Sequence, residues 1–279
     1  MPHTPSFMPS LTTSSALRLR RVLPVGALSL CAAVAQAQDI DSIRMMPTAE
    51  RQSAGFVGLG VATGPRYAGA DDTRTRVLPV AAYYWANGWF ASTLGGVGVN
   101  LSSTPGLQYG PRLTVDFGRK EDSDGRLHGM GNVNPAAELG GFVNYKVVDA
   151  FSVHASLRAG SGEDHKGVRV DLSASYGFQL APGLRLRLGA NTTLGNQAYA
   201  QTHFGVTSSQ SANSGYAPYT PKAGFQDVRA SIGLNYALAP RVMLSTTLTS
   251  TSLLGDAKDS PLVRKTSTVS GQIGVAYGF

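Results

Sequence analysis

Three small groups of residues have the types used in hydrolytic catalysis. His154 and Ser156 are two positions apart, so on a β-strand an imidazole and a hydroxyl would share one face. An Asp-Asp pair at 71–72 and an Asp-His pair at 164–165 contain groups that can activate a water. Adjacent residues on a strand point to opposite faces, and in loops such pairs are common turn formers. We expect both adjacent pairs to be turn formers, whereas His154 and Ser156 depend on the strand that carries them.

Apolar and polar residues alternate along most of the chain, in segments of about ten residues that have the period of β-strands. In residues 108–118, Leu113 and Val115 fall on one face, and Arg112 and Thr114 fall on the other. Gly, Pro, Asn and Asp separate such segments. The predicted strands are 54–62, 74–85, 88–101, 108–118, 136–147, 151–160, 167–180, 184–195, 225–238, 240–252 and 265–279, with a weaker one at 200–210.

These segments predict an all-β fold, either a soluble sandwich or a closed antiparallel transmembrane barrel. Their length suits the roughly 9–11 residues that a tilted strand needs to cross a bilayer, and aromatic residues gather near their ends, as in interface girdles. An open edge in lipid would leave backbone groups unpaired, so the sheet must close. We predict a barrel of about 12 strands, with ten or fourteen as alternatives, because long and short connections do not alternate consistently among twelve.

In a barrel, the strand that carries His154 and Ser156 has one face toward lipid and one face toward the lumen. Their neighbours Val153, Ala155 and Leu157 form the lipid face of the strand, so both polar side chains would point into the lumen. A lipid ester does not reach the lumen, and we therefore expect no catalytic residue and no enzyme. The histidines are scattered and have no metal-ligand spacing, so no metal and no cofactor is expected.

The first 37 residues have the order of a secretory signal peptide. They contain no Asp or Glu, and three arginines precede an apolar run at 22–35, after which comes Ala35-Gln36-Ala37. We expect cleavage after Ala37, which leaves one domain, the barrel, over 38–279. Cleavage removes the only cysteine, Cys31, and the loss of three arginines lowers the formal net charge from +7 to +4. That small excess, without a long basic run, gives no reason to expect a nucleic-acid partner.

The last predicted strand ends in an aromatic residue. Ile273, Val275, Tyr277 and Phe279 lie on one side of the alternation, and no polar tail follows them. We expect this strand to pair with the first one and to carry the signal that the outer-membrane barrel assembly machinery reads.

Four stretches, at 65–90, 118–133, 203–228 and 253–265, resemble the MipA/OmpV family of outer-membrane proteins. His203 departs from the family pattern, in which a Tyr usually precedes Phe-Gly-Val. The resemblance implies a barrel in the lipid of the outer membrane of a Gram-negative bacterium. It also implies a scaffold that docks murein-synthesising and murein-hydrolysing proteins, with the lytic transglycosylase MltA and a bifunctional penicillin-binding protein as partners.

Three functions remain open. A scaffold would use periplasmic turns or the loops 119–134 and 253–264 as contact surfaces. The second of these loops contains Asp256, Asp259, Ser260 and Pro261. A narrow channel would pass small anionic solutes through a lumen whose candidate lining residues are Arg112, Asp116, Arg158, Arg185, Arg187 and Arg229. A surface adhesin or sensor would use the Ser/Asn/Gly/Tyr-rich loop at 207–224.

Overall fold

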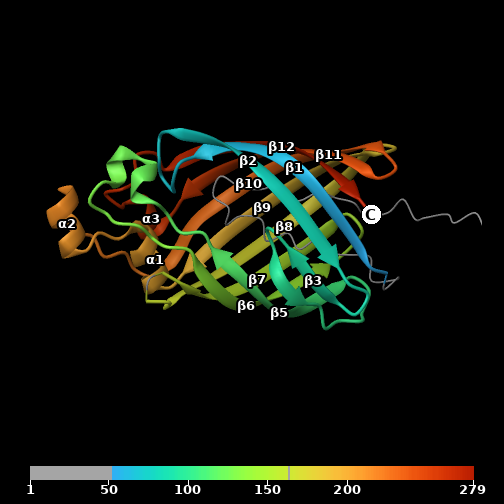
Figure 1. Ribbon diagram of the computed structural model, residues 1–279, viewed down its shortest axis with the longest axis horizontal. Coiled ribbons are helices and arrows are strands. Elements are labelled where there is room, and N and C mark those ends of the chain that lie inside the picture. The colour runs from blue at the N-terminus through green and yellow to red at the C-terminus, as the bar shows by residue number, and fades with distance from the viewer. Residues whose placement is uncertain (1–51, 163) are drawn as a thin grey trace, which may run out of the picture.

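The computed structural model describes residues 52–162 and 164–279, so the predicted signal peptide lies outside the described residues. Twelve strands close into one antiparallel barrel in which each strand pairs with its neighbours in sequence and the last returns to the first (Figure 1). The strands are β1 (Ala54–Pro65), β2 (Thr73–Tyr84), β3 (Trp89–Ser92), β4 (Gly96–Val99), β5 (Leu107–Asp116), β6 (Ala136–Lys146), β7 (Phe151–Ser161), β8 (Gly167–Ala181), β9 (Leu184–Gly195), β10 (Gly224–Ala239), β11 (Val242–Leu253) and β12 (Ser267–Gly278).

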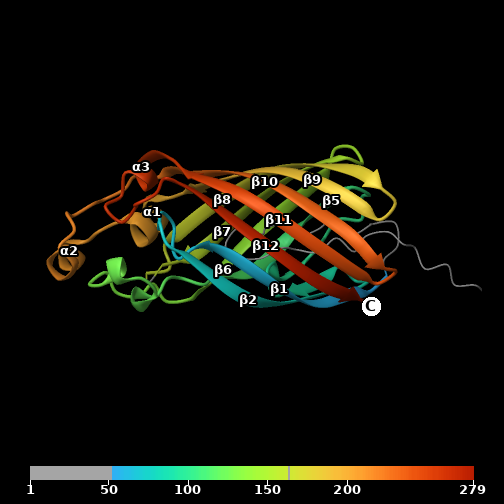
Figure 2. The same cartoon turned by 90° about the horizontal axis from the view of Figure 1, so that it is seen from above.

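The two ends of the barrel differ in their connections. At one end, four of the turns have only two or four residues, and the C-terminal residue lies there as well (Figure 2). At the other end lie long loops and the helices η1 (Glu121–Ser123), η2 (Gly125–Leu127), α1 (Gln197–Phe204), α2 (Ser208–Ser214) and α3 (Gly255–Lys258). Outer-membrane barrels place short turns in the periplasm and long loops outside the cell. This rule makes the helical end extracellular.

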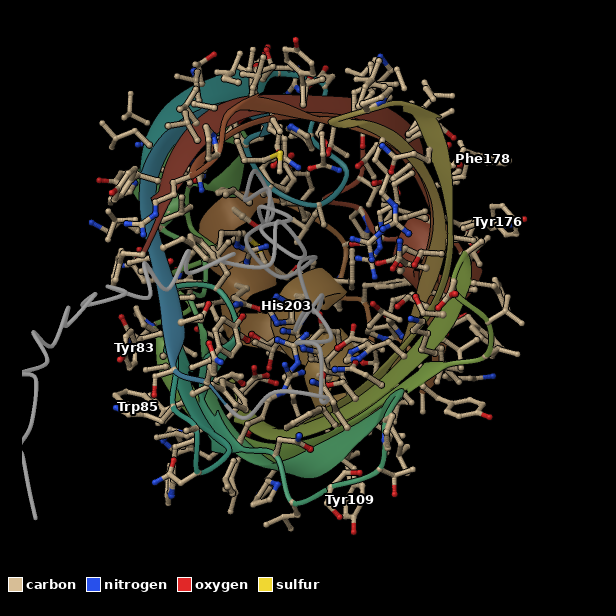
Figure 3. All side chains as sticks on the ribbon, turned by 90° about the vertical axis from the view of Figure 1, so that its right-hand side faces the viewer. Tyr83, Trp85, Tyr109, Tyr176, Phe178 and His203 are labelled. Carbon is tan, nitrogen blue, oxygen red and sulfur yellow. The ribbon has the colours of Figure 1, made fainter. Side chains whose placement is uncertain are left out.

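The outer face of the barrel is apolar because the strand alternation turns aliphatic side chains outward. Exposed examples are Leu59, Val77, Leu113, Leu139, Leu157, Leu172, Ile232, Leu248 and Ile273. Aromatic rings gather outside the short-turn end, where Figure 3 shows Tyr83, Trp85, Tyr109, Tyr176 and Phe178 pointing away from the barrel. An apolar band with an aromatic girdle is the surface that a lipid bilayer solvates. No helix among the described residues is long and apolar enough to cross a membrane.

The predicted number of strands is confirmed, but two of the predicted segments are wrong. The segment 88–101 is not one strand, because Thr93, Leu94 and Gly95 turn the chain between β3 and β4. Gly96 has φ 75°, and a Cβ there would lie 2.0 Å from the Leu113 carbonyl oxygen. The weaker segment 200–210 is not a strand, because it contains the end of α1 and the start of α2.

The extracellular loops form a small hydrophobic core, which we call the loop cap. Tyr67 from the β1–β2 loop packs with Leu127 and Met130 from the β5–β6 loop, and with Val206 and Leu262 from the two loops that follow β9 and β11. The Tyr67 hydroxyl donates a hydrogen bond of 3.0 Å to the Leu262 carbonyl oxygen. Four loops are therefore packed together as one unit at the extracellular end of the barrel.

Candidate functional site

Buried charged side chains gather in the extracellular half of the lumen, and we call them the lumen cluster. Each occupies the inner face of a strand because its neighbours in sequence point toward lipid, as with Leu157 beside Arg158. The buried members on the strands are Arg112, Asp116, Glu138, Arg158, Arg169, Asp171 and Arg229. Charges of both signs occur among them, so each can be neutralised within the lumen.

Arg158 joins two carboxylates from the strands on either side of it. Its Nη2 lies 2.6 Å from Asp171 Oδ2 on β8, and its Nη1 lies 3.5 Å from Glu138 Oε2 on β6. The Nε atom of Arg158 also donates to Asp171, at 3.2 Å. A buried guanidinium of this kind needs several acceptors, since each buried charge without a partner costs several kcal/mol.

A second arginine, Arg169, reaches the same two carboxylates. Its Nη2 lies 3.5 Å from Glu138 Oε2, and its Nε lies 3.8 Å from Asp171 Oδ2. Thr114 Oγ1 donates to Glu138 Oε2 at 3.3 Å. Two arginines and two carboxylates on β6, β7 and β8 therefore form one network rather than separate ion pairs.

The network continues onto β9 and β10 through a threonine. Thr193 Oγ1 donates to Asp171 Oδ1 at 2.8 Å and accepts from Arg229 Nη2 at 2.7 Å. The same Arg229 atom lies 3.4 Å from Asp227 Oδ1. The cluster thus spans five neighbouring strands. Its ion pairs and hydrogen bonds connect the inner faces of β6, β7, β8, β9 and β10.

The helix α1 lies at the extracellular end of the barrel and is bonded to this cluster. His203 Nε2 lies 3.2 Å from Asp116 Oδ2, the Arg169 guanidinium lies 5.7 Å from the centre of the Tyr199 ring, and Figure 3 shows His203 inside the barrel wall. Arg119 Nη1 donates to the carbonyl oxygen of His203 at 3.3 Å. Asn196 caps the start of α1 by accepting from the Tyr199 backbone N–H. The helix is therefore a fixed part of the lumen.

His154 and Ser156 both face the lumen, as the alternation predicts, but each has another partner. His154 Nδ1 is hydrogen-bonded to Asn144 Oδ1, and Ser156 Oγ accepts from Arg112 Nη2. The Arg112 guanidinium also lies 5.9 Å from the centre of the Phe142 ring. Neither residue is thus arranged as a nucleophile with its base.

Arg185 and Arg187 lie nearer the periplasmic end than the other candidate lining residues. They occupy inward positions of β9, since Leu188 on the same strand points outward. Arg187 Nη2 donates to Ser175 Oγ of β8 at 3.2 Å. The structure thus places all six candidate lining residues on the inner face, but only four of them lie in the lumen cluster.

The two adjacent pairs at 71–72 and 164–165 lie in extracellular loops. Asp71 forms an ion pair with Arg126, and this hydrogen bond lowers the pKa of Asp71. Asp164 accepts from the Lys166 backbone N–H in a tight turn, in which His165 has φ 54°. No group of three or more His, Cys, Asp or Glu in the described part of the chain could hold a metal ion.

The loop at 253–264 uses its polar groups inside the loop cap. Asp256 Oδ2 accepts from the Lys222 backbone N–H at 2.8 Å, and Ser260 Oγ donates to the Phe204 carbonyl oxygen at 2.6 Å. Pro261 follows directly, and Asp259 is exposed. These four residues lie at the extracellular end, Asp256 within α3 and the other three directly after it.

Burial in the loop cap changes the titration of Tyr67. Loss of contact with water raises the pKa of Tyr67 to about 12, and the nearby negative charge of Asp124 adds to the effect. The phenol therefore keeps its proton and its hydrogen bond to Leu262 over the physiological range.

Several members of the lumen cluster were missed at the level of sequence. Glu138, Asp171, Thr193 and Asp227 lie in segments that were predicted as strands, at positions that alternate with outward apolar residues. For the three carboxylates among them, an acidic residue at an inward position of a predicted strand was the available signal. Their pairing with particular arginines depends on the register between strands, for which the alternation has no signal.

The chain is similar to several known proteins. A family model described as MltA-interacting protein MipA matches residues 57–279. Among solved structures, the chain is similar to the NanC porin, with 14% identity and a TM-score of 0.46 over 78% of this chain and 98% of that one. It is also similar to the outer-membrane channel DcaP of Acinetobacter baumannii, with 10% identity and a TM-score of 0.39 over 83% and 99% of the two chains. No curated protein matches the chain.

The family match extends over most of the chain, from β1 to β12. It includes the strands that carry the lumen cluster, the helix α1 and the loop cap. The protein is therefore an outer-membrane β-barrel that belongs to the MipA family.

Proposed function

We propose that the protein is a non-conducting scaffold that docks a murein-hydrolysing enzyme at the periplasmic rim of its barrel. The family to which it belongs is described by an interaction with MltA, which supports a protein partner rather than a solute. The role goes beyond the family match. It rests on the ion pairs within the lumen and on the short turns at the periplasmic end of the barrel.

One observation carries the proposal: α1 is hydrogen-bonded to the lumen cluster, in which positive and negative side chains are paired. A channel for anions needs positive groups that a solute can reach, but Arg158 and Arg169 each lie against two carboxylates and Arg229 lies beside a third. The contact between His203 and Asp116 keeps the helix in place over them. A lumen filled in this way supports a protein that works through its surface.

The periplasmic rim offers the surface nearest to murein. It consists of the short turns that follow β2, β6, β8 and β10. Lys146, Asp149 and Arg241 are exposed there, and Lys146 Nζ lies 2.6 Å from Asp149 Oδ1. The loops at 119–134 and 253–264 are at the opposite end, so in this proposal a murein enzyme contacts the turns instead.

Binding of a purified MltA-type lytic transglycosylase to the full-length protein in detergent tests the proposal. The rim variant Lys146→Glu/Arg241→Glu reverses two exposed charges and should weaken binding at least about tenfold, because rim charges steer and orient such contacts. The matched control Lys120→Glu/Lys258→Glu reverses two exposed charges in the extracellular loops and should bind like the wild type. Absence of binding by the wild type, or equal loss in both variants, would contradict the docking surface.

The competing function is a narrow channel for anionic solutes. A steady anion-selective current that disappears in Arg185→Ser/Arg187→Ser would favour the channel and would contradict the filled lumen. Binding and conductance thus separate the two functions without relying on each other.

A further inference from the structure

The barrel wall is incomplete on one side of β2. The hairpin of β3 and β4 has only four residues in each strand, and β3 pairs with residues 82–84 at the periplasmic end of β2. On the other side, β4 pairs with Leu113 and Arg112 of β5. Among the described residues, the extracellular part of β2 from Thr73 to Val80 therefore has a strand neighbour only on its β1 side.

The direction of the backbone groups identifies which atoms lie at this free edge. Ala81 is bonded to Thr93 beyond the tip of β3, through its carbonyl oxygen and its N–H. By strand alternation, the N–H and C=O groups of Thr75 and Val77 point to the same side as those of Ala81. Pro79 also points there and has no N–H to offer, which is where an edge strand tolerates proline.

Lipid cannot satisfy the polar groups of such an edge. The outward side chain of Val77 is 69% exposed on the apolar face, so the edge lies within the lipid-facing band. An unpaired backbone group in hydrocarbon costs several kcal/mol, and a barrel normally removes this cost by full pairing. A polar group that enters the wall at this point would replace the missing strand neighbour.

Two arginines lie on the inner face of β2 within this unpaired stretch. Arg74 and Arg76 alternate with the outward residues Thr75 and Val77, and among the described residues neither forms an ion pair. The Nε atom of Arg76 is buried and has no hydrogen-bond partner among residues 52–162 and 164–279. This pair differs from the lumen cluster, where Arg158 and Arg169 each contact two carboxylates.

The free edge of β2 lies between the extracellular loops, which are above it in the following description, and the apolar outer surface of the barrel, which is below it. Above it, the loop cap joins the two sides of the opening, since Arg66 Nη1 donates to the Ser123 carbonyl oxygen at 3.0 Å. Below it, Val77, Pro79 and the β5 residue Leu113 present an apolar outer surface. A ligand here meets positive charge and free N–H groups at its polar end, and lipid-facing side chains at its apolar end.

We propose that this edge binds a phosphorylated glycolipid of the outer leaflet, with its phosphate held by Arg74, Arg76 and the N–H groups of Thr75 and Val77. Guanidinium groups and backbone N–H groups are strong donors to phosphate oxygens. The edge opens toward the bilayer in its extracellular half, where the acyl chains would lie against Val77 and Leu113. The site is separate from the periplasmic rim proposed for the protein partner.

The test uses the full-length protein in nanodiscs and measures retained lipid by native mass spectrometry. Lipid A with both phosphates is the probe, and lipid A without phosphate and free inorganic phosphate are the two comparison ligands. Arg74→Gln/Arg76→Gln removes the pair. Arg185→Gln/Arg187→Gln is the matched control, because it has the same spacing on the inner face of β9 near the periplasmic end. Heat-modifiable migration of both variants on gels establishes that the barrel is folded.

The wild type and the β9 control should retain phosphorylated lipid A, whereas the β2 variant should bind it at least about tenfold more weakly, as expected for the loss of charge-assisted hydrogen bonds. Dephosphorylated lipid A should be retained no better by the wild type than by the β2 variant. Equal retention in the two arginine variants would overturn the site. Binding of inorganic phosphate as tight as that of lipid A would also overturn it, because the ligand would then be the free anion.

Discussion

His203 on α1 and Asp116 at the end of β5 lie 3.2 Å apart, Nε2 to Oδ2, although 87 residues separate them in the chain. This contact ties a helix of the β9–β10 loop to the opposite part of the barrel wall. Asp116 is fully buried, so its carboxylate depends on the imidazole and on the Gly118 backbone N–H, which donates to it at 3.0 Å.

Replacing His203 by Ala should destabilise the protein by about 1 to 3 kcal/mol, because the buried carboxylate of Asp116 loses one of its hydrogen-bond donors. The free energy of unfolding in urea, measured on protein refolded into bilayers, checks this value. His128→Ala is the control, since that side chain is 89% exposed and should change the free energy very little. Equal losses in the two variants would show that the contact has no structural role.

The loop cap should loosen in alkaline solution because of Tyr67. Its pKa is raised to about 12 in the folded protein, against about 10 in the unfolded chain. The unfolded chain therefore loses the proton first, so the contribution of Tyr67 to stability is full below pH 10 and falls as the pH rises toward 12.

Limited proteolysis of the loops between pH 9 and pH 11 measures this effect. Cleavage should accelerate with pH in the wild type and should depend less on pH in Tyr67→Phe, which has no proton to lose. The variant also lacks the hydrogen bond to Leu262, so it should be cut faster than the wild type at pH 9. The same pH dependence in both proteins would exclude Tyr67 as the titrating group.

Replacing Arg158 by Leu should be among the most damaging single changes in the lumen. It leaves Glu138 and Asp171 buried with fewer positive partners, and removal of one member of a buried ion pair costs about 3 to 5 kcal/mol. Arg241→Leu at the exposed rim is the control and should cost less than about 1 kcal/mol. Urea unfolding of the two variants compares them, and a small effect at Arg158 would mean that the network contributes little to stability.

Phe279 lies at the seam where β12 returns to β1. Its backbone N–H and C=O pair with those of Gly55, and its ring stacks with Tyr83 at 6.2 Å. We predict that Phe279→Ala lowers the yield of heat-modifiable barrel in outer-membrane fractions. Phe225→Ala changes an equally exposed ring near the extracellular end and should leave the yield unchanged. A normal yield for Phe279→Ala would contradict the assembly role of the last strand.

The alternation of residues predicted which side chains face lipid and which face the lumen, because a strand has a strict period of two. Leu113 and Arg112 lie on opposite sides of the wall for this reason. The helix α1 was missed because its eight residues lack an amphipathic stripe. The sequence nevertheless contains capping signals for both helices. Asn196 is an N-cap residue for α1, and Thr207 with Gln210 forms a capping box for α2.

The contacts within the lumen could not be predicted from one sequence. Arg158 meets Asp171 because β7 and β8 pair with Arg158 opposite Arg169, and a shift of one residue would turn every side chain of a strand to the other face. The short hairpin of β3 and β4 was hidden for a related reason. Its two strands continue the same alternation, and only the three-residue turn Thr93-Leu94-Gly95 separates them.

Planar-bilayer conductance of the purified full-length protein tests the filled lumen most directly. We expect no steady current above that of the bare bilayer, because α1 and the ion-paired cluster occupy the extracellular half of the barrel. The matched measurement on a variant with residues 197–204 replaced by a Gly/Ser linker should show openings if the helix closes the path. A steady current through the wild type would contradict the closed lumen and, with it, the proposal of a non-conducting scaffold.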